Sequence, residues 1–169
     1  MVRGRRNPLH FGFALRLALA RKAVGMSGAA VSLAVGMAKD TCSQFEGGRI
    51  PRLDTVEKLA AVLHISPCRL AYGMTQPCEA GTLSAGLPAR LAQLRQERGL
   101  SPRELGQLAG VSHTFVRDTE AGESVPNIAR VEALANALQV ACCWPAYGVG
   151  DRDLPPRQRP PAQPADPAG

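Results

Sequence analysis

The chain has 169 residues, of which 45% are hydrophobic, enough for one ordinary domain or two small ones. Only 4% are aromatic, while Ala, Leu and Val dominate, which favours an all-α protein over sheets of β-branched and aromatic residues. The formal charge of +6 indicates a polyanionic partner, and all of the excess lies in residues 1–80, where 11 Lys and Arg face 5 Asp and Glu.

The N-terminal segment, Met1 to Lys22, combines basic and apolar side chains, as signal peptides do. However, Arg16 interrupts the apolar run, and Arg21 and Lys22 stand where small residues would mark a cleavage site. A transit peptide is Arg-rich and poor in acids in the same way, but this segment matches an internal helical segment at 87–98. We therefore expect it to belong to the folded protein.

An internal repeat relates the two halves of the chain. At an offset of 74 the sequence pairs Leu17 with Leu91, Arg21 with Arg95, Gly25 with Gly99, Ser27 with Ser101, Gly36 with Gly110, Glu46 with Glu120, and Gly48 with Gly122. After one inserted residue the offset is 75, pairing Pro51 with Pro126, Val56 with Val131, Leu59 with Leu134, Ala60 with Ala135, Leu63 with Leu138, Tyr72 with Tyr147, and Gly73 with Gly148. We expect two related domains, at 11–73 and 86–148, each of five short helices.

In the first copy, helices are predicted from Ser27 to Gly36 and from Ala38 to Gly48. Ala38 cannot cap a helix as Ser112 can in the second copy. The next helix has apolar residues at helical spacing, namely Leu53, Val56, Leu59, Ala60 and Leu63. Ser66 and Pro67 then open a last turn. Residues 74–85 are expected to form a linker.

The second copy has stronger helix signals. Gly99 ends its first helix, and Ser101, Pro102 and Glu104 form a capping box at the start of the next. The third helix is capped by Ser112 and ends at Gly122, and the fourth places apolar residues on one face, namely Ile128, Val131, Leu134, Ala135 and Leu138. The segment 142–147 closes the unit. The Pro-rich residues 149–169 are expected to be a disordered tail.

Catalytic and metal-binding patterns are missing from the sequence. The five cysteines (Cys42, Cys68, Cys78, Cys142 and Cys143) form no C-x-x-C pair, so we expect reduced, mostly buried thiols and no metal site. The three histidines lie far apart, and the Gly-rich phosphate-binding motifs are absent. We therefore expect no enzyme, no cofactor and no catalytic residue.

The second and third helices of each copy, joined by a Gly-containing turn, match a helix-turn-helix. The stretch 94–138, LRQERGLSPRELGQLAGVSHTFVRDTEAGESVPNIARVEALANAL, resembles the phage-repressor and Cro-like helix-turn-helix family, also called the Xre family. Residues 15–72 resemble a more divergent member. The resemblance implies that each copy is a five-helix bundle whose third helix enters the DNA major groove.

The resemblance also implies a set of contact residues. The base-edge candidates are Lys39, Asp40, Ser43 and Gln44 in the first copy and His113, Thr114, Arg117 and Asp118 in the second. The phosphate candidates are Arg49, Arg52 and an N-terminal arm with Arg3, Arg5 and Arg6. The alternative is that these residues form a solvated helix face that makes no contact with DNA bases. This is more plausible in the second copy, because Glu123 replaces Arg49 there.

Arg21 with Glu46, and Arg95 with Glu120, match a buried Arg–carboxylate pair of phage repressors in this family. Each pair would join the first helix to the end of the third. The alternative is independent surface charges.

We expect a bacterial, cytoplasmic and nucleoid-associated transcriptional regulator that binds double-stranded DNA sequence-specifically, with most of its affinity in the first copy. It could form a homodimer, and nothing indicates a membrane or a small-molecule ligand. One alternative is a protein-interaction or dimerisation module in which the second copy has weak or lost DNA binding. Another is a non-specific nucleoid coat protein.

Overall fold

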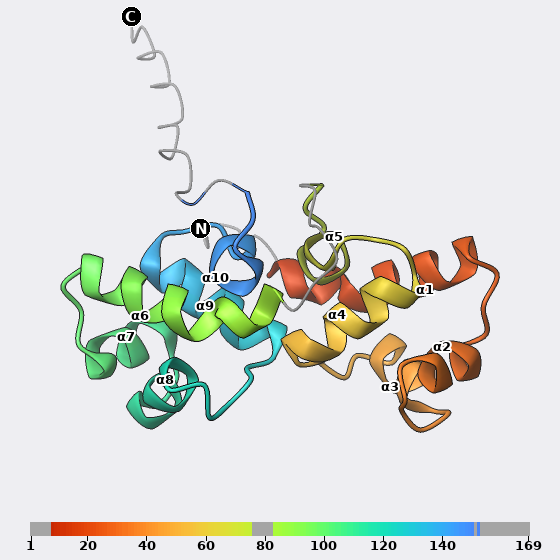
Figure 1. The fold of residues 1–169 in the computed structure, drawn as a ribbon, viewed down its shortest axis with the longest axis horizontal. Coiled ribbons are helices and arrows are strands. Elements are labelled where there is room, and N and C mark those ends of the chain that lie inside the picture. Colours follow the sequence, from red (N-terminus) through yellow and green to blue (C-terminus); the bar gives the residue numbers. More distant parts are fainter. Residues whose placement is uncertain (1–7, 76–82, 151, 153–169) are drawn as a thin grey trace, which may run out of the picture.

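Ten α-helices and two 3₁₀ turns make up the computed structural model, which describes residues 8–75, 83–150 and 152. The first unit contains η1 (Leu9–Gly12), α1 (Phe13–Ala23), α2 (Gly28–Ala34), α3 (Thr41–Glu46), α4 (Leu53–Val62) and α5 (Pro67–Tyr72). The second contains η2 (Leu83–Gly86), α6 (Leu87–Glu97), α7 (Pro102–Ala109), α8 (His113–Glu120), α9 (Ile128–Leu138) and α10 (Cys143–Tyr147). No strand occurs within these ranges, and the prediction of two all-α five-helix units is confirmed (Figure 1).

Two of the predicted segments fall largely outside the described residues. The basic arm with Arg3, Arg5 and Arg6 lies there, and so does nearly all of the Pro-rich tail. The turn η2 begins within the expected linker and continues directly into α6.

Serine caps begin several of the helices. The hydroxyls of Ser27, Ser66, Ser101 and Ser112 each accept a backbone N–H three residues later. Glu104 completes a capping box, because its carboxylate accepts the N–H of Ser101 at 2.8 Å. A cap of this kind stabilises a helix by about 1 kcal/mol. The helix starts are thus fixed by local sequence.

The third helix of the first unit departs from the predicted boundary. It begins at Thr41 rather than near Ala38 and has six residues, whereas α8 has eight. Ala38 offers no capping oxygen, and its carbonyl closes a turn with the N–H of Thr41 at 2.9 Å. The hydroxyl of Ser32 on α2 instead accepts the N–H of Cys42 at 2.9 Å. Lys39 and Asp40 therefore lie in the turn that precedes α3.

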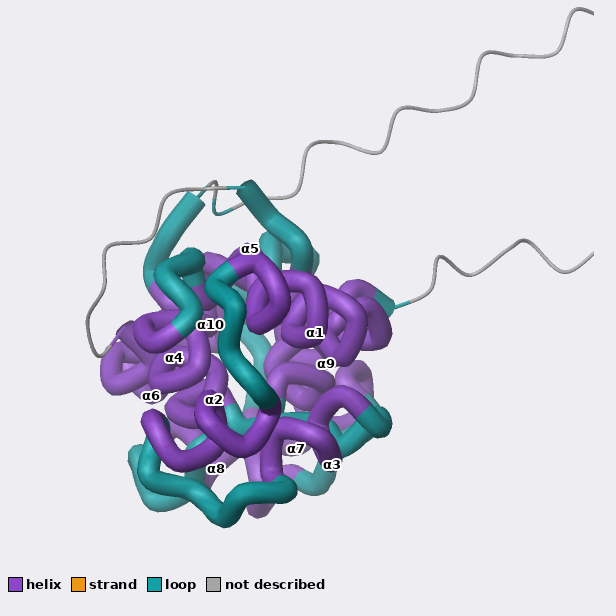
Figure 2. The backbone as a smooth tube through the Cα atoms, turned by 90° about the vertical axis from the view of Figure 1, so that its right-hand side faces the viewer, coloured by secondary structure: helices purple, strands orange, loops and turns teal. Residues whose placement is uncertain are grey.

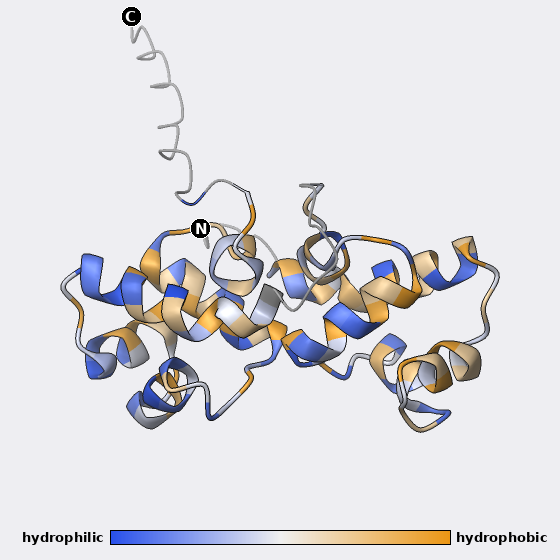
Figure 3. Ribbon diagram, viewed as in Figure 1, coloured by the Kyte–Doolittle hydropathy of each residue, from blue (hydrophilic) through white to orange (hydrophobic). Residues whose placement is uncertain are grey.

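A continuous apolar core runs through both units. It includes repeat-related buried pairs, among them Leu17 and Leu91, Val56 and Val131, Leu59 and Leu134, Leu63 and Leu138, and Tyr72 and Tyr147. Figure 3 shows hydrophobic and hydrophilic stretches alternating along the helices, as amphipathic helices require. The repeat is therefore preserved in the packing, while the two units share one core.

An approximate two-fold axis relates the units, and we call it the pseudo-dyad. It passes between Arg52 and Asn127, which form an isolated antiparallel bridge. Leu53 donates its N–H to the carbonyl of Pro126, and Ile128 donates to Pro51, each at 3.1 Å. These positions correspond at the offset of 75, so the bonds are reciprocal, as they are across the two-fold interface of a symmetric dimer. The chain thus resembles a dimer built from one polypeptide.

A second reciprocal contact joins each 3₁₀ turn to the other unit, and we call these contacts the cross-unit clamps. Glu132 on α9 accepts the backbone N–H groups of Leu9 at 2.6 Å and His10 at 3.0 Å. Glu57 on α4 accepts the N–H and the hydroxyl of Ser84 at 2.6 and 2.8 Å. Carboxylates that accept several N–H or O–H groups hold those groups in fixed positions. The clamps therefore fix the two units relative to each other.

Membrane-spanning potential is limited to one bent pair of segments. Within the described ranges no single helix has the length and hydropathy to cross a bilayer, and Leu9–Ala23 with Gly28–Ala34, at 93° to each other, meet the criterion only together.

Candidate nucleic-acid interface

The third helices of the two units, α3 and α8, lie on the same side of the molecule. Figure 1 shows both along its lower edge, on opposite sides of the pseudo-dyad. The view turned by 90° in Figure 2 also places both at the bottom, away from α5 and α10. This placement follows from the reciprocal contacts, because a two-fold relation carries a surface of one unit onto the same side of the other.

The turn before each third helix is a glycine turn. Gly36 and Gly110 have φ values of +74° and +69°, a left-handed conformation that costs glycine little and other residues more. Each glycine ends the second helix and turns the chain toward the third. These two repeat-related glycines thus set the direction of the third helices.

Seven of the eight predicted base-edge residues are exposed, and Asp118 is partly exposed. The opposite faces of the same helices are buried through Cys42 and Phe45 on α3 and through Val116 and Thr119 on α8. Burial also raises the pKa of the Cys42 thiol to about 11, which keeps it neutral. Each third helix therefore packs on the core through one face, and the predicted residues lie on its other face or, for Lys39 and Asp40, in the turn that precedes α3.

Three of the first unit's candidates form one exposed network. Gln44 donates from its amide nitrogen to Asp40 at 2.5 Å and accepts a bond from Arg49 at 2.6 Å. The guanidinium of Arg49 also lies 5.7 Å from the centre of the Phe45 ring. The predicted base-reading amide and the predicted phosphate contact are therefore joined in the free protein.

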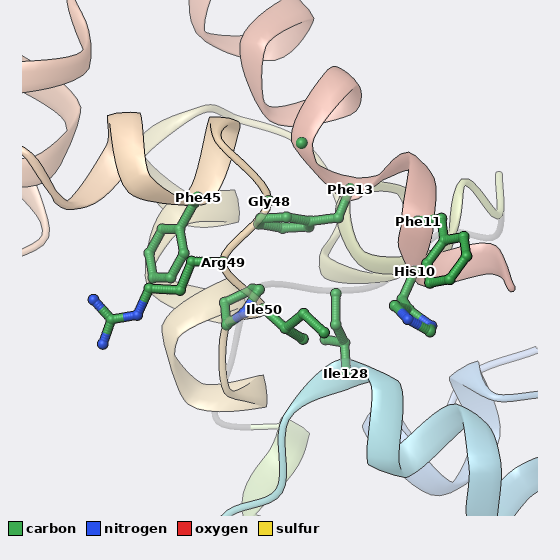
Figure 4. Close-up of a pocket in the computed structure, with 10 residues that line it drawn as sticks. His10, Phe11, Phe13, Phe45, Gly48, Arg49, Ile50 and Ile128 are labelled. Atoms are coloured by element: carbon green, nitrogen blue, oxygen red, sulfur yellow. The ribbon is translucent and has the colours of Figure 1, made fainter.

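A cavity of about 200 Å³ lies behind this network, at the seam between the units. Figure 4 shows Phe13, Ile50 and Ile128 around it, with Phe45 and Arg49 at one side and His10 at the other. The rings of Phe13 and Phe45 meet edge to face, with centroids 6.3 Å apart. In the second unit Leu87 and Thr119 take these two positions. The aromatic support beneath Arg49 is thus a feature of the first unit.

Arg52 lies apart from that network, at the pseudo-dyad between the two third helices. Its side chain is 58% exposed and lies 3.4 Å from the carboxylate of Asp54. Because the pair is exposed, it leaves the guanidinium accessible to solvent. A phosphate contact from this position would fall between the two units.

The second unit presents a different surface. Glu123 is exposed where the first unit has Arg49, and the nearby Arg130 stacks on Phe115 at 4.5 Å. Of the base-edge candidates, Arg117 carries the positive charge, and Asp118 carries a negative one beside it. The two third helices therefore differ in charge as well as in length.

The structure joins both Arg–Glu pairs that the resemblance implied. Arg21 binds Glu46 through Nε and Nη2 at 2.7 and 3.1 Å, and Arg95 binds Glu120 at 2.6 and 2.9 Å. Between 12% and 23% of each side chain is exposed. The remaining Nη1 of each arginine donates to a backbone carbonyl, that of Met26 or Leu100. Each arginine thus fixes the third helix to the first and to the turn before the second.

Proton linkage gives the first pair a defined pH dependence. The hydrogen bonds from Arg21 hold the pKa of Glu46 below its ordinary range. Because the folded-state pKa is the lower one, this stabilisation is present above the unfolded-state pKa and is lost as the pH falls through the folded-state value. The pair therefore stabilises the fold at neutral pH.

Sequence reasoning missed the polar residues that hold each unit together and those that hold the two units to each other. Arg16 and Arg90 each donate two bonds to the last carbonyls of α5 and α10, and Glu57 and Glu132 form the cross-unit clamps. The signal was present, because Arg16 pairs with Arg90 at the first offset of the repeat, and Glu57 pairs with Glu132 at the second. A polar residue that is identical at equivalent positions of the two copies is thus a candidate for a hydrogen bond that holds the fold together.

A family model described as a helix-turn-helix domain matches the chain twice, at residues 13–72 and 87–141. No curated protein and no solved structure matches it. The two matched regions cover more than half of the chain and contain α1–α5 and most of the second unit. The assignment to the Xre and Cro-like group holds at the level of the superfamily. The chain belongs to the helix-turn-helix domain family, as two tandem copies of a DNA-binding regulatory module.

Proposed function

We propose that the protein is a sequence-specific transcriptional regulator that reads the DNA major groove with α3 and α8. The observation that carries this proposal is the presence of both third helices on one side of the molecule, across the pseudo-dyad from each other. Two-fold helix-turn-helix proteins use this arrangement to place recognition helices in successive major grooves. The exposed base-edge candidates then face the DNA while Arg49 and Arg52 contact phosphates.

The chemistry of the first unit supports reading by α3. Gln44 can bind adenine through two hydrogen bonds, and Lys39 can bind guanine. Arg49 and Arg52 supply positive charge that the second unit lacks, because Glu123 and Asn127 take these two positions there. The first unit therefore contributes more of the sequence-independent affinity, and both third helices contribute to the choice of sequence.

Replacing Gln44 tests the base-reading role. We expect Gln44→Ala to cost about 1 to 3 kcal/mol of binding at one base pair and little at the others, because one side chain reads one base edge. Binding titrations against duplexes substituted at each position would measure it. Gln96→Ala on α6, which is also an exposed helix residue, is the control. Equal losses on every duplex would contradict the assignment.

Replacing Arg49 tests the phosphate contact. We expect Arg49→Ala to weaken binding to all sequences and to reduce the slope of log K against log salt by about one unit, because one phosphate contact is lost. Arg117→Ala should weaken non-specific binding less. Arg69→Ala is a matched control, because it removes the same charge from an exposed position on α5, a helix that Figure 1 shows on the side of the molecule away from α3 and α8. An unchanged slope for Arg49→Ala would refute the contact.

Selection from a random duplex pool tests the proposal as a whole. The full chain is used, at fixed salt and with unrelated DNA as competitor. We expect enrichment of a defined motif, whose affinity exceeds that of unrelated duplex by a factor of about 10³ or more. Binding without enrichment would instead support a non-specific coat protein. No binding at all would leave the protein-interaction module as the remaining interpretation.

A further inference from the structure

The pseudo-dyad is completed within one chain, which determines how DNA can be read. In an ordinary two-fold dimer each chain supplies one recognition helix, so both helices are identical and the operator is a palindrome. Here α3 and α8 belong to the same chain and come from different sequence. The two halves of the reading surface need not recognise the same bases.

The contacts that would otherwise join two chains are already made internally. The carbonyls of Pro51 and Pro126 accept bonds across the pseudo-dyad, and Glu57 and Glu132 hold the 3₁₀ turns of the opposite units. Tyr72 adds a bond from its hydroxyl to the carbonyl of Ile128 at 3.2 Å. A second chain is therefore not needed to place two third helices on one side.

The predicted contact residues in and beside the two third helices differ at every corresponding position. The offset of 74 pairs Lys39 with His113, Asp40 with Thr114, Ser43 with Arg117, Gln44 with Asp118, and Arg49 with Glu123. An exposed glutamine amide prefers adenine, whereas an exposed arginine prefers guanine. The two halves also differ in shape, because α3 has six residues and α8 has eight.

We infer that one chain occupies a whole operator made of two unlike half-sites, in a single orientation. This rests on the proposed function, since it specifies the DNA that the same two helices read. The half-sites lie on one face of the duplex, and their centres are about 10 base pairs apart, one helical turn. Gln44 selects bases in one half-site and Arg117 selects bases in the other.

The test uses the full chain and the duplex obtained by selection. Sedimentation of a labelled duplex gives the stoichiometry, and we expect one chain per duplex. Two further duplexes carry either half-site twice, as a palindrome. We expect each palindrome to bind about tenfold or more weakly, because the wrong half-site presents several mismatched base pairs.

Variants assign the half-sites. We expect Gln44→Ala to relax the base preference in one half-site and Arg117→Ala in the other, while Arg69→Ala changes neither. Two chains on each selected duplex, with a palindromic motif and both variants acting on both halves, would overturn the inference and leave the proposed function standing. Failure to enrich any motif would overturn both.

Discussion

Replacing Glu132 by Ala is expected to lower the free energy of unfolding by about 3 kcal/mol, because three partly buried donors on η1 lose the acceptor that they share. Glu132 is 5% exposed, and its carboxylate accepts the backbone N–H groups of Leu9 and His10 and a bond from His10 Nδ1 at 2.6 Å. Its removal costs about 1 to 3 kcal/mol for each donor that stays buried. Since η1 is held to α9 by these bonds, the loss also weakens the contact between the units.

Denaturant unfolding followed by helical circular dichroism measures this effect. Glu132→Gln is the control, because it keeps a side-chain acceptor at the same place and should lose less stability. Glu57→Ala removes the other cross-unit clamp, and we expect a smaller loss, because Glu57 is less completely buried than Glu132. A loss below about 1 kcal/mol for Glu132→Ala would show that the clamp does not hold the units together.

The second large effect is expected at the Arg95–Glu120 pair. Both side chains are largely buried, and the guanidinium forms two bonds to the carboxylate. Glu120→Ala leaves that guanidinium partly buried without its partner, so we expect the unfolding free energy to fall by about 2 to 3 kcal/mol. The value lies toward the lower end of the range for fully buried pairs, because part of each side chain still reaches water.

A double-mutant cycle isolates the interaction energy between Arg95 and Glu120 from the effects of each substitution on other contacts. Arg95→Ala, Glu120→Ala and the double variant should give a coupling energy of about 1 kcal/mol or more. Glu123→Ala, an exposed acid three residues along the chain, should change stability by less than about 0.5 kcal/mol. Additive single variants, with no coupling, would mean that the two charges act independently.

The features that the sequence predicts well are local or repeated. Glycines, serine caps and helical spacing fix where most helices begin and end, and the offset of the repeat identifies equivalent core positions. The start of α3 was predicted three residues too early, because its first turn depends on Ser32, a residue of another helix, rather than on a local cap. Capping from a distant residue is not visible in a local pattern.

The relation between the units depends on contacts between residues far apart in the chain. Leu9 and His10 meet Glu132 across more than 120 positions, and Leu53 meets Pro126 across the pseudo-dyad. Spacing alone does not predict such pairs. The repeat does restrict such pairs. In a reciprocal interface, a contact between one residue of each unit recurs between the two residues at the equivalent positions. The candidate contact residues were predicted through the resemblance, and their base preferences remain predictions.

One chain is expected to present its two third helices to successive major grooves of one duplex. Hydroxyl-radical footprinting of both strands of the selected duplex, bound to the full chain, tests it most directly. The pseudo-dyad predicts two protected regions on one face of the duplex, about one helical turn apart, with unlike sequences beneath them. A single protected region, or uniform protection along the whole duplex, would contradict the claim.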